Sequence, residues 1–144
     1  MARYSLLVFL ACAGAGAAVA PEDAVKRDLE QFQGSWKAVA ILQADGLPAP
    51  DEDVLVTRLA VVGTKFTMTG KNYVINGTFT IDPSKTPKEI DVLLASENGP
   101  QVRLLGIYQI QGSTRQSRFA LPEKSRPTQF TSEKGFVGFT WTRD

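Results

Sequence analysis

The feature that most constrains this chain is a series of short segments in which apolar and polar residues alternate, each followed by a turn. Tyr73–Ile81 has the clearest pattern, and its apolar residues on one side are Tyr73, Ile75, Phe79 and Ile81. Successive side chains of a β-strand point to opposite faces, so this segment is expected to be a strand with one buried face. Gly77 interrupts the apolar side, which indicates a bend or bulge.

The same reasoning predicts about eight strands, mostly joined by hairpin-length turns. They are Ser35–Gln43, Arg58–Val62, Lys65–Thr69, Tyr73–Ile81, Glu89–Ala95, Val102–Ile110, Gln116–Leu121 and Phe136–Arg143. This spacing is typical of an up-and-down barrel or a sandwich. We favour a small all-β antiparallel barrel formed by residues 21–144 as one domain, because closure removes exposed strand edges. In the first strand, the apolar face is expected to carry Trp36, Ala38, Ala40 and Leu42.

A short helix is expected before the barrel. Val25, Leu29 and Phe32 follow one another at helical spacing, and Gly34 comes directly after as a stop signal. Asp51–Val56 is expected to form a further helical turn with Asp51 as its N-cap. The irregular stretch Pro122–Gly135 could add a short edge at Thr128–Thr131.

Composition excludes several classes of chemistry. The chain has no His and a single Cys, Cys12, so a Ser-His-Asp or Cys-His site, a His-ligated metal and a disulfide framework are excluded. Beyond the first twenty residues, where Arg3 is the charged residue, basic and acidic side chains balance. This balance does not favour nucleic acid as a partner. No metal and no cofactor are expected.

Met1–Ala20 has the pattern of a secretory signal peptide. Arg3 supplies the positive start, Leu6–Ala13 the apolar centre, and Ala18-Val19-Ala20 a small-x-small cleavage pattern. Because Pro21 disfavours cleavage directly before it, Ala17 or Ala18 could be the last residue removed. We therefore expect an exported protein, periplasmic or extracellular, with no transmembrane segment after cleavage.

A lipoprotein is the alternative. Phe9-Leu10-Ala11-Cys12 is similar to a degenerate lipobox, in which Cys12 would carry the lipid. Otherwise Cys12 is a small apolar residue of the signal.

Two groups of residues resemble known families. Gly34-Ser35-Trp36 is similar to the G-x-W element of lipocalins, in which the Trp closes one end of the barrel and an Arg near the last strand covers it. That resemblance implies that Gly34, Trp36 and Arg143 close the barrel.

A longer set of motifs resembles an uncharacterised family of small secreted lipocalin-like domains abundant in planctomycete bacteria. The motifs are Gln33-Gly34-Ser35-Trp36-Lys37, Ile81-Asp82-Pro83-Ser84-Lys85 with Pro87-Lys88 and Ile90-Asp91, Leu105-Gly106-Ile107-Tyr108 and Arg126-Pro127-Thr128-Gln129-Phe130-Thr131-Ser132. The resemblance spans about 28–143 and implies a fold and a compartment, but no catalytic residues. Ser113–Ala120 departs from the family pattern, which leaves the register of the strand around Gln116–Leu121 open.

A barrel of about eight strands can be filled by side chains or can hold one small ligand. Our leading hypothesis is binding of a small, largely apolar molecule by inward residues: Ile75, Phe79, Val92, Leu104 and Tyr108. Tyr108 is either a core residue whose hydroxyl bonds to backbone or water, or a polar handle inside the cavity.

Two other functions stay open at this stage. One is a protein-interaction or inhibitor module of the cell envelope, working through the loops Asp45–Val56 and Pro122–Gly135. In the second loop, Arg126 could pair with an anion, with Glu123 or with Glu133. The other is an enzyme using carboxylate or Tyr chemistry, which no spacing of residues favours. The acidic run Asp51-Glu52-Asp53 is explained by a solvated helix start.

Overall fold

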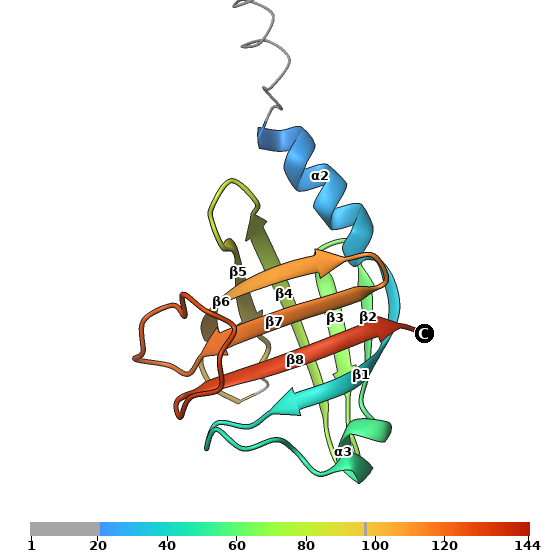
Figure 1. Cartoon of the computed structure of the whole chain (residues 1–144), viewed down its shortest axis with the longest axis vertical. Helices are drawn as coiled ribbons and strands as arrows, with labels where there is room; N and C mark the ends of the chain where they lie inside the picture. Colours follow the sequence, from blue (N-terminus) through green and yellow to red (C-terminus); the bar gives the residue numbers. More distant parts are fainter. Residues whose placement is uncertain (1–20, 97) are drawn as a thin grey trace, which may run out of the picture.

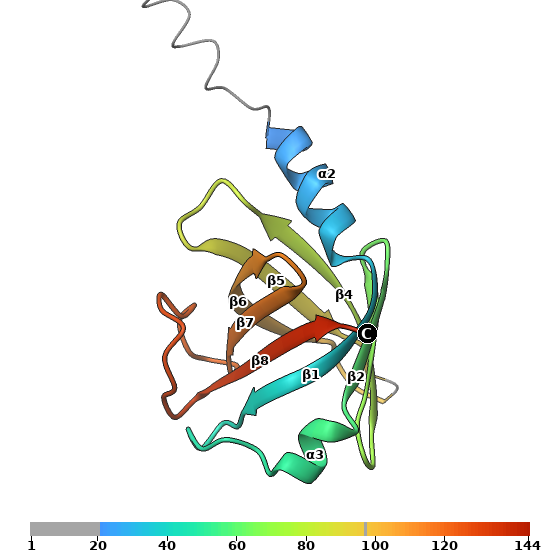
Figure 2. The ribbon, with the colours of Figure 1, turned by 45° about the vertical axis from the view of Figure 1, so that its right-hand side comes forward.

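The computed structural model describes residues 21–96 and 98–144. One helix, α2 (Pro21–Phe32), precedes the strands, and a short helix, α3 (Asp51–Leu55), follows the first strand. The strands are β1 (Gly34–Leu42), β2 (Arg58–Val62), β3 (Lys65–Thr69), β4 (Val74–Asp82), β5 (Lys88–Leu94), β6 (Val102–Gln111), β7 (Thr114–Ala120) and β8 (Phe136–Arg143). Figures 1 and 2 show α2 at one end of the strands and α3 at the other.

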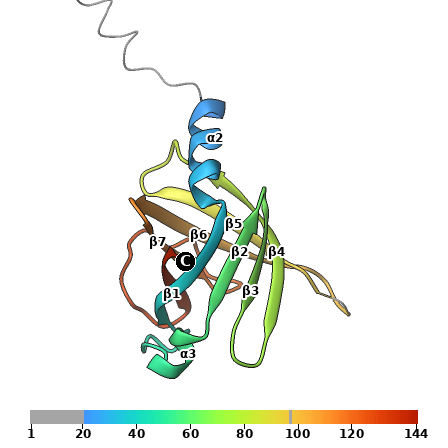
Figure 3. The ribbon, with the colours of Figure 1, turned by 90° about the vertical axis from the view of Figure 1, so that its right-hand side faces the viewer.

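The eight strands form a closed antiparallel barrel in which each strand pairs with its neighbours in sequence. Figure 3 shows β1 to β4 following one another along the wall. Closure comes from β1 and β8, which pair from Trp36 opposite Arg143 to Leu42 opposite Gly138. The predicted all-β, up-and-down barrel with a helix before it is therefore confirmed.

Two of the hairpins depend on glycine. Gly63 links β2 to β3, and Gly112 links β6 to β7, each with a φ of 63° and each first in a two-residue turn. Glycine takes this position in type II′ turns because other residues adopt positive φ poorly, and these turns match the twist of paired strands. Because such short turns force consecutive strands to pair with each other, they account for the predicted strand order.

The predicted faces of β1 hold only for its first half. Trp36 is buried and Ala38 half-buried, but Ala40 is exposed, while Ile41 and Leu42 are half-buried. The reason is a bulge: the pairing with β8 shifts between Ala38 and Ala40. An extra residue in one strand moves every later side chain to the other face.

Three local predictions are wrong. The seventh strand begins at Thr114 rather than Gln116, because β7 pairs with β6 directly after the turn at Gly112. Asp51 lies inside α3, whose N-cap is Pro50 and which has no side-chain cap. Pro122–Gly135 contains no strand at Thr128–Thr131, since the segment crosses the outside of the barrel without a neighbouring edge to pair with.

The core lies inside the barrel and under α2. Its buried residues are Phe32, Trp36, Leu59, Val61, Phe79, Ile90, Val92, Tyr108, Phe119 and Trp141. Among residues 21–96 and 98–144, no helix has the length and apolarity to cross a membrane. The predicted signal, Met1–Ala20, and the alternative lipid site at Cys12 lie outside the described residues.

The wall of the barrel leaves no room for a side chain at Gly106. A Cβ there would lie 2.5 Å from Phe119 Cδ1 and 2.6 Å from the carbonyl oxygen of Arg118. We expect Gly106→Ala to lower the free energy of unfolding by about 1–3 kcal/mol, the usual cost of overpacking. Urea unfolding followed by tryptophan fluorescence measures this change.

Gly99→Ala is the matched control, because the φ of Gly99 lies outside the left-handed region and a Cβ there would meet nothing nearer than Ser96 Oγ at 3.5 Å. Equal losses in the two variants would show that the close contact at Gly106 is not what disfavours a side chain there.

Candidate functional site

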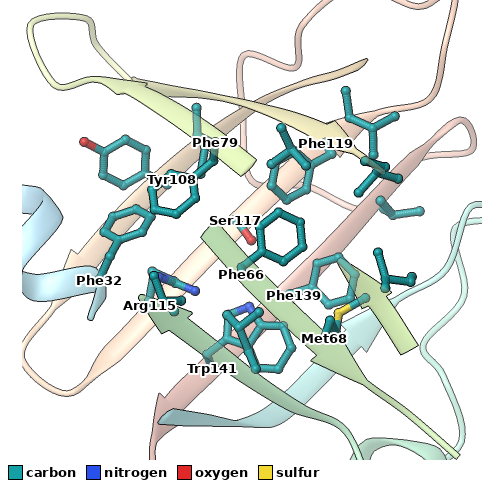
Figure 4. Close-up of a pocket in the computed structure, with 18 of the residues that line it drawn as sticks. Phe32, Phe66, Met68, Phe79, Tyr108, Arg115, Ser117, Phe119, Phe139 and Trp141 are labelled. Atoms are coloured by element: carbon teal, nitrogen blue, oxygen red, sulfur yellow. The ribbon is translucent and has the colours of Figure 1, made fainter. Parts of the chain in front are cut away.

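The inside of the barrel is hollow. A cavity of about 270 Å³ lies between the inward faces of the strands and the end of α2, and Figure 4 shows the side chains around it. Most of them are apolar. They include all five residues predicted to bind a ligand: Ile75, Phe79, Val92, Leu104 and Tyr108.

One end of the cavity is covered by the last residue of α2. The ring of Phe32 stacks on Phe79 at a centroid distance of 5.2 Å and meets Tyr108 edge-on at 5.1 Å. Phe32 is only 2% exposed. The spacing of apolar residues predicted that Phe32 lies on the helix, but it did not reveal that Phe32 also lines the cavity.

Trp36 closes the same end. Its indole Nε1 donates to the carbonyl oxygen of Phe32 at 2.9 Å. The guanidinium carbon of Arg143 lies 4.4 Å from the centroid of the Trp36 ring, and Arg143 donates to the carbonyl oxygens of Gln31 and Gln33. These contacts fix the C-terminal end of α2 on the barrel, where a cation also suits the helix dipole.

The hydroxyl of Tyr108 does not serve as a free handle in the cavity. It donates to Asp28 Oδ2 at 2.7 Å, and Lys88 Nζ lies 2.9 Å from the same oxygen. Asp28, on α2, is buried. Burial and the hydrogen bond to the Asp28 carboxylate together raise the pKa of Tyr108 far above its usual value. The partner is thus a helix carboxylate rather than the expected backbone or water.

Arg115 places a charge beside the apolar cavity. On β7 its side chain shares the inward face with Ser117 and Phe119, and it is only 5% exposed. Its guanidinium carbon lies 4.3 Å from the ring centroid of Phe32 and 4.6 Å from that of Trp36. Among the described residues, its Nη1 has no hydrogen-bond partner.

Burial, and to a lesser degree the charge of Arg143, lower the pKa of Arg115 to about 9. The guanidinium therefore stays charged at neutral pH. The two aromatic faces stabilise it in part, but they cannot accept the hydrogen bonds that its N–H groups offer. Arg115 and Ser117 are not among the predicted site residues: the predicted strand Gln116–Leu121 begins after Arg115, and its register stays open, so Ser117 is assigned to neither face. The signal that could have identified them is the two-residue period of a strand: counted back from the apolar Phe119, the same face carries Ser117 and then Arg115.

The cavity is most accessible at the end away from α2. Near the helix most of its lining is buried, Phe66 being half-buried, whereas four residues at or just beyond the far ends of β5, β6, β7 and β8 are half-buried: Leu94, Leu104, Leu121 and Val137. Phe32 and Arg115 therefore lie at the end of the cavity that is farther from this opening.

The long segment Pro122–Gly135 is held on the outer wall. Arg126 Nη1 lies 2.7 Å from Asp91 Oδ1 and donates to the carbonyl oxygen of Gly106 at 2.8 Å, while its Nε lies 3.5 Å from Glu89. The expected partners Glu123 and Glu133 are thus replaced by residues of β5. Burial would raise the pKa of Asp91, but hydrogen bonds from Arg126 and Arg103 outweigh burial and lower it.

No group of three or more His, Cys, Asp or Glu side chains in the described parts of the chain is placed to hold a metal ion. No protein-family model, curated protein or solved structure matches this chain significantly.

The hydrogen bond from Tyr108 to Asp28 of α2 is expected to stabilise the protein, so removal of the Tyr108 hydroxyl should be destabilising. Tyr108→Phe should lower the free energy of unfolding by about 1.5–3 kcal/mol, as expected when a buried carboxylate loses a hydrogen bond. Tyr73→Phe is the control, since Tyr73 is 43% exposed. Chemical denaturation of both variants measures the difference, and an unchanged Tyr108→Phe would mean that Lys88 alone satisfies Asp28.

We expect Arg115 to lower the free energy of unfolding of the protein. We expect Arg115→Met to raise the free energy of unfolding by about 1–3 kcal/mol, because it removes an unpaired buried charge and keeps the contacts with Phe32 and Trp36. Arg143→Met should instead lower it, since Arg143 is exposed and donates to two carbonyl oxygens. Thermal and urea unfolding would reveal the signs, and a destabilised Arg115→Met would contradict this account.

Proposed function

We propose that this protein binds a small, largely apolar molecule in its barrel rather than catalysing a reaction. The observation that carries the proposal is the apolar cavity of about 270 Å³. For comparison, an engineered apolar cavity of roughly 150 Å³ binds benzene. An eight-stranded closed barrel fits a lipocalin-like binding fold in general.

The shape of the site supports the proposal. One end is covered by Phe32 and Trp36, and the other is lined by half-buried leucines. A concave, mostly apolar site with few polar groups and one accessible end is typical of small-molecule sites.

Binding can be tested with the neutral fluorescent dye N-phenyl-1-naphthylamine. We expect saturable binding with increased dye fluorescence, and we expect Leu104→Trp to weaken it at least tenfold because the larger side chain fills the cavity. Leu105→Trp is the matched control: Leu105 is the next residue of β6 and lies on the outer face. Dye binding that is absent from the wild type, or equal in the two variants, would refute the proposal.

Export belongs to the same proposal. The signal-like pattern of Met1–Ala20 and the resemblance to secreted lipocalin-like domains support a periplasmic or extracellular protein. Intact-mass analysis of the exported protein would locate the cleavage site near Ala20. A species beginning at Cys12 with added acyl mass would establish the lipoprotein alternative instead.

Protein interaction in the cell envelope is the second candidate. Three apolar side chains in the loop Asp45–Val56 favour it, because Leu47, Leu55 and Val56 are 61%, 70% and 46% exposed. If this loop binds a partner, Leu55→Ser should abolish its capture from the exported fraction and leave dye binding unchanged.

A further inference from the structure

Among the described residues that line the cavity, Arg115 is the charged one, and none is acidic. The hydroxyl of Tyr108 is already bound to Asp28, and the Asp28 carboxylate already contacts Lys88. The cavity therefore contains a buried cation and no anion to pair with it.

We infer that the ligand is an amphipathic molecule with one anionic group, and that Arg115 binds this group at the closed end of the cavity. The inference rests on the proposed binding function and names its ligand class. Arg115 is only 5% exposed, lines the cavity and leaves Nη1 without a partner among the described residues. A carboxylate, or a sulfate or phosphate ester, would accept a charge-assisted hydrogen bond from the guanidinium.

The surroundings of Arg115 strengthen such a contact. Phe32 and Trp36 pack against the guanidinium and exclude water from it. An ion pair in a site of low dielectric is stronger than the same pair in water. Ser117, the next inward residue of β7, adds a hydroxyl on the same face (Figure 4).

The position of Arg115 also orients the ligand. The cation lies beside Phe32 and Trp36 at the covered end, whereas Leu94 and Leu104 line the accessible end. The anionic group would enter first, and the apolar part would lie along the leucines toward the mouth.

The test compares decanoate with 1-decanol, which share a chain length and differ in charge. Decanoate is titrated below its micelle concentration and 1-decanol below its solubility limit, each against the protein loaded with N-phenyl-1-naphthylamine. For the wild type, Arg115→Met and Arg115→Lys, the readout is the concentration that displaces half of the dye. Arg118→Met is the matched control, since Arg118 is also buried but lies on the outer face of the same strand.

We expect Arg115→Met to weaken displacement by decanoate about tenfold to a hundredfold, the range for loss of a hydrogen bond to a charged group. Displacement by 1-decanol should stay within about twofold. Arg115→Lys should restore part of the decanoate effect because it keeps the charge, and Arg118→Met should match the wild type. Acetate, which lacks an apolar chain, should not displace the dye at the same concentrations.

The test distinguishes failure of the proposed binding function from failure of the proposed role of Arg115. If neither the dye nor 1-decanol binds the wild type, the proposed function itself is wrong. If both bind but Arg115→Met weakens decanoate no more than 1-decanol, the cavity binds neutral molecules and the role of Arg115 is refuted. Displacement by acetate alone would indicate an adventitious anion only.

Discussion

The pairing of β1 with β8 is the constraint on which the rest of the structure depends. It joins the ends of the sheet, so that no strand is left with an unpaired edge. It also defines an inside, because alternate residues of every strand then face a common interior. The bulge after Ala38 lets β1 keep this pairing while its inward face changes from Trp36 and Ala38 to Ile41. Closure of the barrel therefore encloses the cavity.

The helix α2 makes the two ends of the barrel unequal. Its last residue, Phe32, packs on interior aromatic rings, while Asp28 accepts hydrogen bonds from Tyr108 and Lys88. Trp36 and Arg143 bind the carbonyl oxygens at the end of the helix. Together these apolar and polar contacts hold α2 over one end of the barrel. The accessible end is the opposite one, where the lining is half-buried.

Arg115 differs from the other charged residues near the barrel end. Arg143 stays at the surface and donates to backbone oxygens, and Lys88 pairs with Asp28. Arg115 instead has its charge buried between two aromatic rings with an unsatisfied Nη1. A packed apolar side chain there would favour folding. Groups that lower stability occur commonly at functional sites, and the unpaired charge of Arg115 lies at the wall of the cavity.

The sequence by itself determined the strands, their order and the apolar interior, because alternation and turn residues act locally and each hairpin fixes the next pairing. It also placed Ile75, Phe79, Val92, Leu104 and Tyr108 on inward faces. Only the tertiary structure decided the bulge in β1 and the pairing of Asp28 with Tyr108, since these depend on residues 80 or more positions apart in the chain. The register of β7, which the sequence left open, is fixed nearer by, through the turn at Gly112 and the pairing with β6. The cavity and the burial of Arg115 were also decided only by the tertiary structure, because whether side chains fill a barrel depends on how all eight strands pack together.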